Sequence, residues 1–238
     1  MTNHRPHYRN TSTLLPLEKF AAKITARVPV TVSFFGDSIS DVDRLPGAFG
    51  GATCRTTHYA QVFRQLAGQE WDCPNLTIHY FGICAQNTYE GLGRIHWLEP
   101  VRPDLTVVAF GANDLAHHKL PPEATAQALG LIFQRLRGSI GSEVVAMAAS
   151  TGGPQFSLWD RVPLLIAAQR EACAQQAVPF VDTHAELLCR LAAGEDWVRY
   201  FPAHDDCHPN DAGHRLWGET LFKVVKAEVA NAIQPGKI

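Results

Sequence analysis

The stretch Val30-Thr-Val-Ser-Phe-Phe-Gly-Asp-Ser-Ile-Ser40 joins a run of apolar, largely β-branched and aromatic residues to a small polar turn. Residues 30–35 fit a strand that is buried on both faces and that ends at Gly36. Near-continuous apolar strands of this kind are typical of parallel sheets with helices on both sides. The stretch therefore predicts a central parallel strand with polar residues at its carboxyl end.

The same pattern recurs along the chain, with longer segments of helical spacing between the apolar runs. Further strands are predicted at 75–81, 104–110, 143–149 and 178–182. Helices are predicted at 59–66, 88–98, 124–136, 162–176 and, with Asn210 or Asp211 as cap, 211–232. This alternation predicts an α/β fold in which one parallel five-stranded sheet lies between two helical layers. Ligands of such sheets bind beyond the carboxyl ends of the strands, where polar residues gather in this chain.

Bulk composition indicates one domain. The 238 residues, 46% of them hydrophobic, can form a single core, which we place at about 28–232 within one domain spanning 1–238. Residues 1–14 are predicted to form a flexible or surface arm. The net charge of −2 and the lack of a dense Lys/Arg run argue against a nucleic-acid partner.

The expected location is the cytoplasm. Residues 1–10 are polar and lack the apolar centre of a signal peptide. The chain contains no apolar run near the ~20 residues needed to cross a bilayer, so no membrane span is expected. Its six cysteines show no paired CxxC spacing, which favours reduced thiols over a disulfide framework.

Ser38 is the first candidate for catalysis. A serine hydroxyl becomes an effective nucleophile when a base removes its proton, and a serine at a strand-to-helix turn can present its oxygen above the sheet edge. A helix cap is the alternative role for such a serine. The GxSxG motif of α/β-hydrolases does not occur in the chain. Ser38 therefore needs partners elsewhere in the sequence to be read as a nucleophile.

Those partners occur in the segment His204-Asp-Asp-Cys-His-Pro-Asn210. Asp205 precedes His208 by three residues in a predicted turn, so its carboxylate can hold one imidazole nitrogen while the other acts as base on Ser38. A metal site is one alternative, although the HExxH and CxxC frameworks of zinc sites are lacking. A solvated helix-entry turn is another. We favour a Ser38, Asp205 and His208 triad and predict no metal.

The third candidate segment, Gly111-Ala-Asn-Asp114, follows the strand predicted at 104–110. Acyl transfer builds negative charge on the carbonyl oxygen, and a fixed donor such as the Asn113 amide lowers the barrier by ~3 kcal/mol. An Asn-Asp turn or helix cap is the alternative. Asp114 fits that alternative better, as a scaffold residue that holds the loop.

Together, four blocks of the chain resemble the SGNH hydrolase superfamily of GDSL-like esterases and lipases. In chain order the blocks are Gly36-Asp-Ser38, the turn 82–88, Gly111-Ala-Asn-Asp114 and Asp205-Asp-Cys-His-Pro209. The resemblance extends over about residues 28–225. It implies a flavodoxin-like three-layer α/β/α sandwich and hydrolysis of carboxylic esters without a metal or organic cofactor. It makes Ser38 the nucleophile, His208 the base and Asp205 the orienting carboxylate. It also implies an oxyanion hole formed by the N–H of Ser38, the N–H of a second-block glycine and the Asn113 side chain.

The second block departs from the family pattern, in which a glycine precedes Asp-Thr or a similar pair. Here the turn reads Gly82-Ile-Cys-Ala-Gln-Asn-Thr88, and the following Gly91-Leu-Gly-Arg-Ile95 resembles the family's next helix and sets the register. That register places Ala85 at the oxyanion glycine. Alanine still offers a backbone N–H, but a positive φ would strain it, and Gly82 is the alternative donor.

The resulting expectation is a serine hydrolase that cleaves small acyl esters, with short acyl or acetyl groups preferred, through an acyl-enzyme on Ser38. An acyltransferase with the same triad and a non-catalytic binding module that retains the fold are the alternatives. No particular oligomeric state is predicted.

Overall fold

A five-stranded parallel sheet forms the centre of the molecule. The computed structural model describes residues 16–41, 56–149, 152, 156–202 and 207–234, and the arm predicted at 1–14 lies outside this part of the chain. The strands are β1 (Val30–Gly36), β2 (Leu76–Gly82), β3 (Leu105–Ala109), β4 (Glu143–Met147) and β5 (Phe180–Val181). Their order is β2-β1-β3-β4-β5, and every neighbouring pair is parallel. This is the strand order of flavodoxin-like proteins, so the predicted fold class is confirmed.

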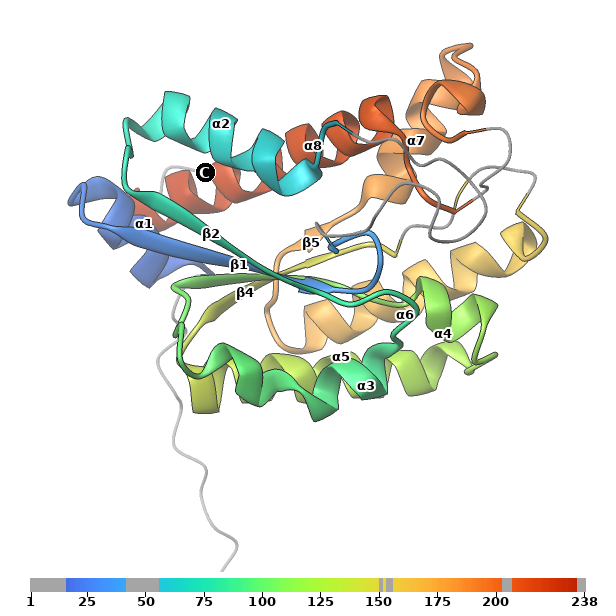
Figure 1. Ribbon diagram of the computed structural model, residues 1–238, viewed down its shortest axis with the longest axis horizontal. Coiled ribbons are helices and arrows are strands. Elements are labelled where there is room, and N and C mark those ends of the chain that lie inside the picture. Colours follow the sequence, from blue (N-terminus) through green and yellow to red (C-terminus); the bar gives the residue numbers. More distant parts are fainter. Residues whose placement is uncertain (1–15, 42–55, 150–151, 153–155, 203–206, 235–238) are drawn as a thin grey trace, which may run out of the picture.

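Helices cover both faces of the sheet (Figure 1). One layer contains α1 (Glu18–Thr25), α2 (Tyr59–Trp71) and α8 (Asp211–Ile233), and the other contains α3 (Thr88–Gly93), α5 (Pro122–Arg135) and α6 (Val162–Gln175). Two further helices, α4 (Ala112–Ala116) and α7 (Thr183–Ala192), follow β3 and β5. The three layers of the expected sandwich are therefore present.

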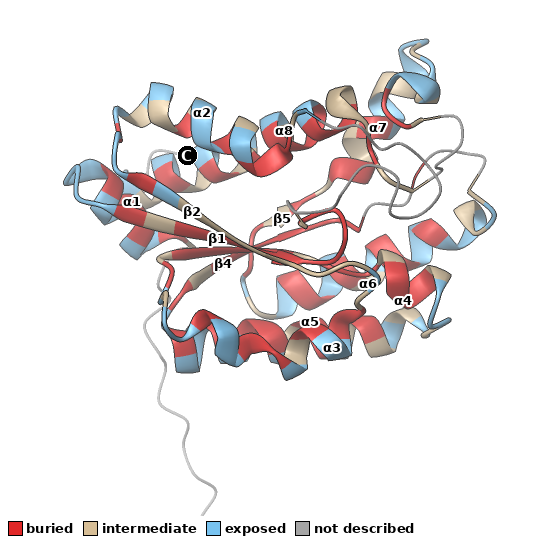
Figure 2. Ribbon diagram, in the orientation of Figure 1, coloured by how far each residue is buried: buried red, intermediate tan, exposed pale blue. Residues whose placement is uncertain are grey.

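Residues within each central strand alternate between the two layers. Val32 and Phe34 of β1 belong to the core under α1, α2 and α8, whereas Phe35 packs edge-to-face with Phe110 under the opposite helices. Figure 2 shows the central strands as buried. Burying one such side chain contributes ~1.5–3 kcal/mol. A slip of one residue would exchange the two cores, so the register of β1 is strongly specified.

This register brings the carboxyl ends of three strands to one edge of the sheet. Gly36 at the end of β1 pairs with Gly82 at the end of β2 and with Ala109 at the end of β3. The first three sequence blocks therefore begin side by side.

The structure contains three α-helices that the sequence pattern did not predict, α1, α4 and α7. The N-terminus of α1 is capped from a distance, because the Glu143 carboxylate accepts the N–H groups of Lys19 at 3.0 Å and Phe20 at 2.7 Å. The strand predicted at 178–182 is shorter in the structure, because α7 begins directly after Asp182. The Asp182 side chain caps this helix by accepting the Ala185 N–H at 2.8 Å. That cap limits β5 to two residues.

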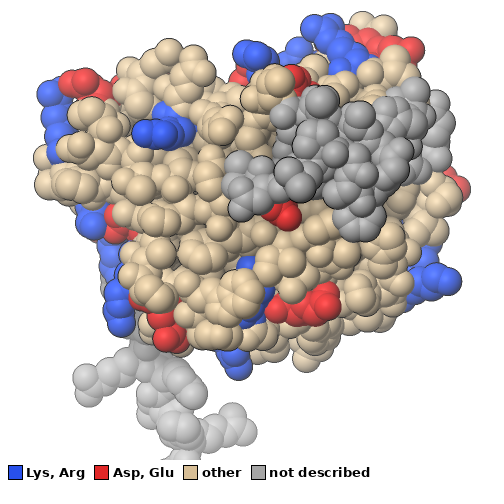
Figure 3. Space-filling model, viewed as in Figure 1, with Lys and Arg blue, Asp and Glu red and all other residues tan. Residues whose placement is uncertain are grey.

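Charged side chains of both signs are scattered over the face shown in Figure 3, among larger uncharged areas. Positive and negative groups are interleaved there, as expected for a chain with a net charge of −2. Within the described ranges, no helix combines the length and the apolar character that a membrane span requires.

Candidate active site

The turn after β1 presents Ser38. Gly36 must lack a side chain, because a Cβ atom there would lie 2.4 Å from both the carbonyl oxygen of Ala109 and the hydroxyl of Ser40. The Ser40 hydroxyl is hydrogen-bonded to the hydroxyl of Tyr59 at 2.7 Å. These buried contacts hold the backbone on both sides of Ser38 in place.

The hydroxyl oxygen of Ser38 lies 2.9 Å from Nε2 of His208, although 170 positions separate the two residues in the chain. His208 precedes α8, whose first turn is capped by the side chain of Asn210. The structure thus brings together the predicted nucleophile and the predicted base. Asp205, the predicted third member of the triad, lies outside the described residues.

The other imidazole nitrogen of His208, Nδ1, lies 3.3 Å from the sulfur of Cys207. A base that takes a proton on Nε2 must carry its own hydrogen on Nδ1. In that tautomer Nδ1–H needs an acceptor, and a thiol sulfur is a weak one. A carboxylate is the stronger partner for the productive tautomer.

Asn113 connects the block after β3 to the block after β2. Its side-chain nitrogen donates a hydrogen bond to the main-chain carbonyl of Gln86 at 3.0 Å, and the residue is buried. A side-chain amide nitrogen carries two hydrogens, so this bond occupies one of them and orients the other.

Asp114 joins the same two blocks at a second point. Its carboxylate accepts hydrogen bonds from the hydroxyl and the N–H of Thr88, the latter at 3.1 Å, and from the hydroxyl of Thr125 at 3.0 Å. Asp114 is fully buried, and a buried carboxylate needs such donors because burial disfavours its charged form. These contacts match the structural role predicted for Asp114.

Ala85 has a φ of +63°, in the left-handed region. The positive φ that would strain alanine at this position is therefore present, at a cost of ~1–2 kcal/mol. Gly82, the alternative donor, has a packing role, because a Cβ atom there would lie 2.2 Å from main-chain atoms of Ser40 and Asp41.

Two buried ionisable groups, Asp37 and Arg94, lie in and against the turn that carries Ser38. Burial raises the pKa of the Asp37 carboxyl to about 7, although the N–H of Ile39 and the charge of Arg94 oppose the rise. Burial lowers the pKa of Arg94 to about 10, so its guanidinium is charged near neutral pH. Sequence reasoning did not identify Arg94 as a residue of the site. Arginines are usually exposed to solvent, and nothing in the neighbouring sequence indicates that this one is buried.

The side chains gathered at this edge of the sheet are a hydroxyl, an imidazole and a carboxamide. This set suits nucleophilic attack on a carbonyl group, with a base for the nucleophile and a donor for the developing negative charge. No group of three His, Cys, Asp or Glu side chains in the described part of the chain is arranged to hold a metal ion.

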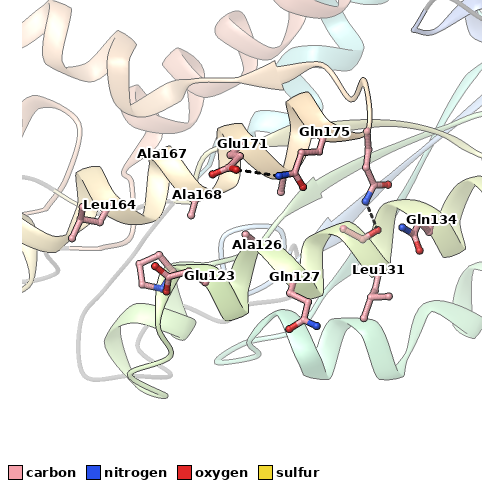
Figure 4. Close-up of a pocket in the computed structure, with 14 residues that line it drawn as sticks. Glu123, Ala126, Gln127, Leu131, Gln134, Leu164, Ala167, Ala168, Glu171 and Gln175 are labelled. Carbon is pink, nitrogen blue, oxygen red and sulfur yellow. Dashed lines mark hydrogen bonds between the residues drawn. The ribbon is translucent and has the colours of Figure 1, made fainter. Parts of the chain in front are cut away.

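A groove between α5 and α6 is separate from this set of residues (Figure 4). Leu131 of α5 and Leu164 of α6 are among its lining residues. None of its lining residues belongs to the turns that carry Ser38, Asn113 or His208. The groove is therefore not part of the candidate active site.

Comparison with known proteins connects this geometry to a family. The model of the GDSL-like lipase/acylhydrolase family matches residues 34–216, a range that contains Ser38, Asn113 and His208. Comparison with curated protein sequences finds no significant match.

Solved structures share the fold. A lipase/acylhydrolase from Enterococcus faecalis is 21% identical with a TM-score of 0.64, and the match covers 83% of this chain and 96% of that one. An acetyl xylan esterase, AlAXEase, is 18% identical with a TM-score of 0.66, covering 82% and 100%. A two-domain esterase active on acetylated mannans is 19% identical with a TM-score of 0.70, covering 91% and 54%. Because the family match spans most of the chain, the protein belongs to the GDSL-like lipase/acylhydrolase family of carboxylic ester hydrolases.

Proposed function

We propose that the protein hydrolyses esters of short acyl groups, acetate above all, through an acyl-enzyme on Ser38. The observation that carries this proposal is the 2.9 Å contact between Ser38 Oγ and His208 Nε2, which joins a nucleophile to a base within reach of its proton. Asp205 supplies the carboxylate that keeps the hydrogen of His208 on Nδ1 and stabilises the imidazolium.

In the first half of the reaction, Ser38 Oγ attacks the ester carbonyl carbon while its proton passes to His208. The tetrahedral intermediate then breaks its bond to the alkoxy oxygen, which takes that proton and leaves as the alcohol. In the second half, water gives a proton to His208 and adds to the acyl carbon. Collapse of the second intermediate releases the carboxylic acid and returns the proton to Ser38. The protons balance over the cycle, which needs no cofactor.

The carbonyl oxygen becomes negative in both halves of the reaction. The N–H groups of Ser38 and Ala85 and the side-chain amide of Asn113 are the donors that we assign to it. The bond from Asn113 to Gln86 supports this assignment, since a donor oriented beforehand needs no reorganisation as charge develops. The positive φ of Ala85 supports it too, because backbone strain of this kind clusters at functional sites.

The choice of acetyl esters is supported by the proteins that share the fold. One of them is an acetyl xylan esterase and another is active on acetylated mannans. An acetylated carbohydrate is therefore the substrate class that we propose for this chain.

Turnover and covalent labelling test the chemistry. Wild-type protein should release p-nitrophenol from p-nitrophenyl acetate, with an initial burst where deacylation is the slower step, and a fluorophosphonate should label Ser38 stoichiometrically. Ser38→Ala should lose labelling and lower kcat at least ~10³-fold, whereas Ser157→Ala, at an exposed position, should keep both. Wild-type turnover by Ser38→Ala would exclude the acyl-enzyme.

A graded series of substrates tests the acyl preference. The ratio kcat/KM should fall from acetate through butyrate to octanoate esters, and acetylated xylo-oligosaccharides should lose acetate. A preference for octanoate would contradict the proposed substrate class. Product analysis with an added sugar alcohol measures how much acyl group goes to water and how much to an alcohol.

A further inference from the structure

Arg94, the C-cap residue directly after α3, makes a hydrogen bond with each of its guanidinium nitrogens. Nε donates to Oε1 of Gln86 at 2.5 Å, Nη1 to the carbonyl of Phe81 at 2.7 Å, and Nη2 to the carbonyl of Gly36 at 2.7 Å. The planar fork of arginine serves several acceptors in fixed directions, which the single ammonium of lysine does not.

Two of these acceptors belong to active-site segments. Gly36 precedes Ser38 by two residues, and Gln86 directly follows Ala85. The main-chain carbonyl of Gln86 is also the acceptor for the Asn113 amide, at 3.0 Å. One guanidinium group therefore bonds to the nucleophile turn and to the turn of Ala85, and it reaches the Asn113 segment through Gln86.

The surroundings of Arg94 make its charge costly. The residue is 4% exposed, and its guanidinium lies 4.5 Å from the ring centre of Phe35 and 5.7 Å from that of Phe110. An apolar side chain here would avoid desolvating a charge, but it would leave the acceptors of Arg94 without their donor. The use of arginine here points to a need for its directed hydrogen bonds.

The turn at Ala85 needs such restraint. A residue with a φ of +63° persists only when the surrounding structure holds it there. The Gly36 carbonyl accepts both the N–H of Ile83 at 3.1 Å and the Nη2 of Arg94. Arg94 thus binds the same carbonyl as the first N–H of the turn, and it binds the Gln86 side chain just after the strained residue.

From these contacts we infer that Arg94 is a positioning residue for ester hydrolysis. It holds the Ala85 turn and, through Gln86, the Asn113 amide in the geometry that receives the carbonyl oxygen. The inference depends on the function proposed above, and it concerns kcat more than substrate binding. Because a displacement of ~1 Å in a site costs on the order of 100-fold in rate, loss of the fork should lower kcat ~10- to 100-fold and change KM less than ~3-fold.

The experiment compares Arg94→Lys with Arg137→Lys on p-nitrophenyl acetate. Arg137 is an exposed control for the arginine fork, because it donates to the carbonyls of Gln176 and Ala177, and Ala177 also has a positive φ, of 48°. That turn leads into the amino end of β5, at the sheet edge opposite Ser38. Arg94→Lys should show the loss in kcat, and Arg137→Lys should stay within ~2-fold of wild type. Wild-type kcat in folded Arg94→Lys would overturn the inference.

A double-mutant cycle with Asn113→Ala separates positioning from general destabilisation. If Arg94 acts through Asn113, the two changes together should cost clearly less than the product of the two single losses. If the loss in kcat of the double variant equals the product of the two single losses, Arg94 does not act on Asn113 through Gln86.

Gln86→Ala provides a second test of the inference, because this partly exposed side chain can be shortened with little effect on folding. It removes one acceptor of Arg94 and should lower kcat ~10-fold; an unchanged kcat would contradict the inference. Failure of the proposed function has a different signature, in which wild type and Arg137→Lys neither hydrolyse the esters nor react with fluorophosphonate at Ser38.

Discussion

The side-chain amide of Asn113 donates to the main-chain carbonyl of Gln86 at 3.0 Å, so the segments after β2 and β3 meet in one hydrogen bond. The bond directs the second amide hydrogen before any substrate arrives. A donor arranged in this way contributes most where charge develops, in the transition state.

Asn113→Ala is therefore expected to lower kcat ~100- to 1000-fold with little change in KM. Asn113→Asp keeps the shape of the side chain but replaces the donor with an acceptor, and should be at least as damaging. Steady-state kinetics with p-nitrophenyl acetate measure both variants. A rise in KM at constant kcat would instead assign Asn113 to ground-state binding.

The proposed orienting role of Asp205 predicts that Asp205→Asn lowers kcat ~10⁴-fold, since an amide favours the wrong tautomer of His208. Asp206→Asn is the matched control, because it removes an identical charge at the next position. The comparison is made at the pH of maximal turnover. Similar losses in the two variants would refute the assignment of Asp205.

Ala85→Gly tests the strain at the oxyanion turn. Glycine adopts the φ of +63° without a Cβ clash, so unfolding in urea should show a gain of ~1 kcal/mol in stability. Ala177→Gly is the control, because Ala177 has a similar conformation with a φ of 48°. This variant should gain stability while its kcat stays that of wild type. A loss of stability in Ala85→Gly would contradict the strain.

Asp37→Asn should change how stability depends on pH. The folded pKa of about 7 exceeds the unfolded value of 3.8, so between these values the unfolded state releases a proton that the folded state keeps. The contribution of Asp37 to the stability of the wild type therefore falls as pH rises through this window, by on the order of 4 kcal/mol at most.

The asparagine variant lacks this proton release. The free energy of unfolding of Asp37→Asn minus that of wild type should thus rise from pH 4 to pH 8, whatever its constant offset. Urea titrations at intervals of pH measure the difference, and a flat or falling curve would refute the raised pKa.

The central sheet could be predicted because a strand buried on both faces requires a continuous apolar run, as residues 30–35 show. The α1 helix could not be predicted in the same way. Its first N–H groups are satisfied by Glu143, which lies 123 positions from Phe20, and the residue before it, Leu17, has a φ of 62° in place of a usual capping conformation. The sequence around a helix cannot reveal a cap that a distant strand supplies.

In the candidate site, too, some residues could be predicted from the sequence and others could not. Ser38, Asn113 and His208 could be named as candidates because ester hydrolysis requires particular side chains in particular turns. Arg94 could not, since two of its acceptors are main-chain carbonyls, which every residue possesses. The value of φ at Ala85 likewise depends on how the turn packs between β2 and α3.

The long separation between Ser38 and His208 has a consequence for how the protein is made. As the ribosome extends the chain, Ser38 emerges early and His208, the base proposed for it, follows only after 170 further positions. An incomplete chain that stops before His208 lacks the proposed general base of Ser38, and so should not hydrolyse esters. In a refolding experiment, recovery of esterase activity should mark the moment at which the entry of α8 docks onto the end of β1, because that contact closes the longest loop within the site.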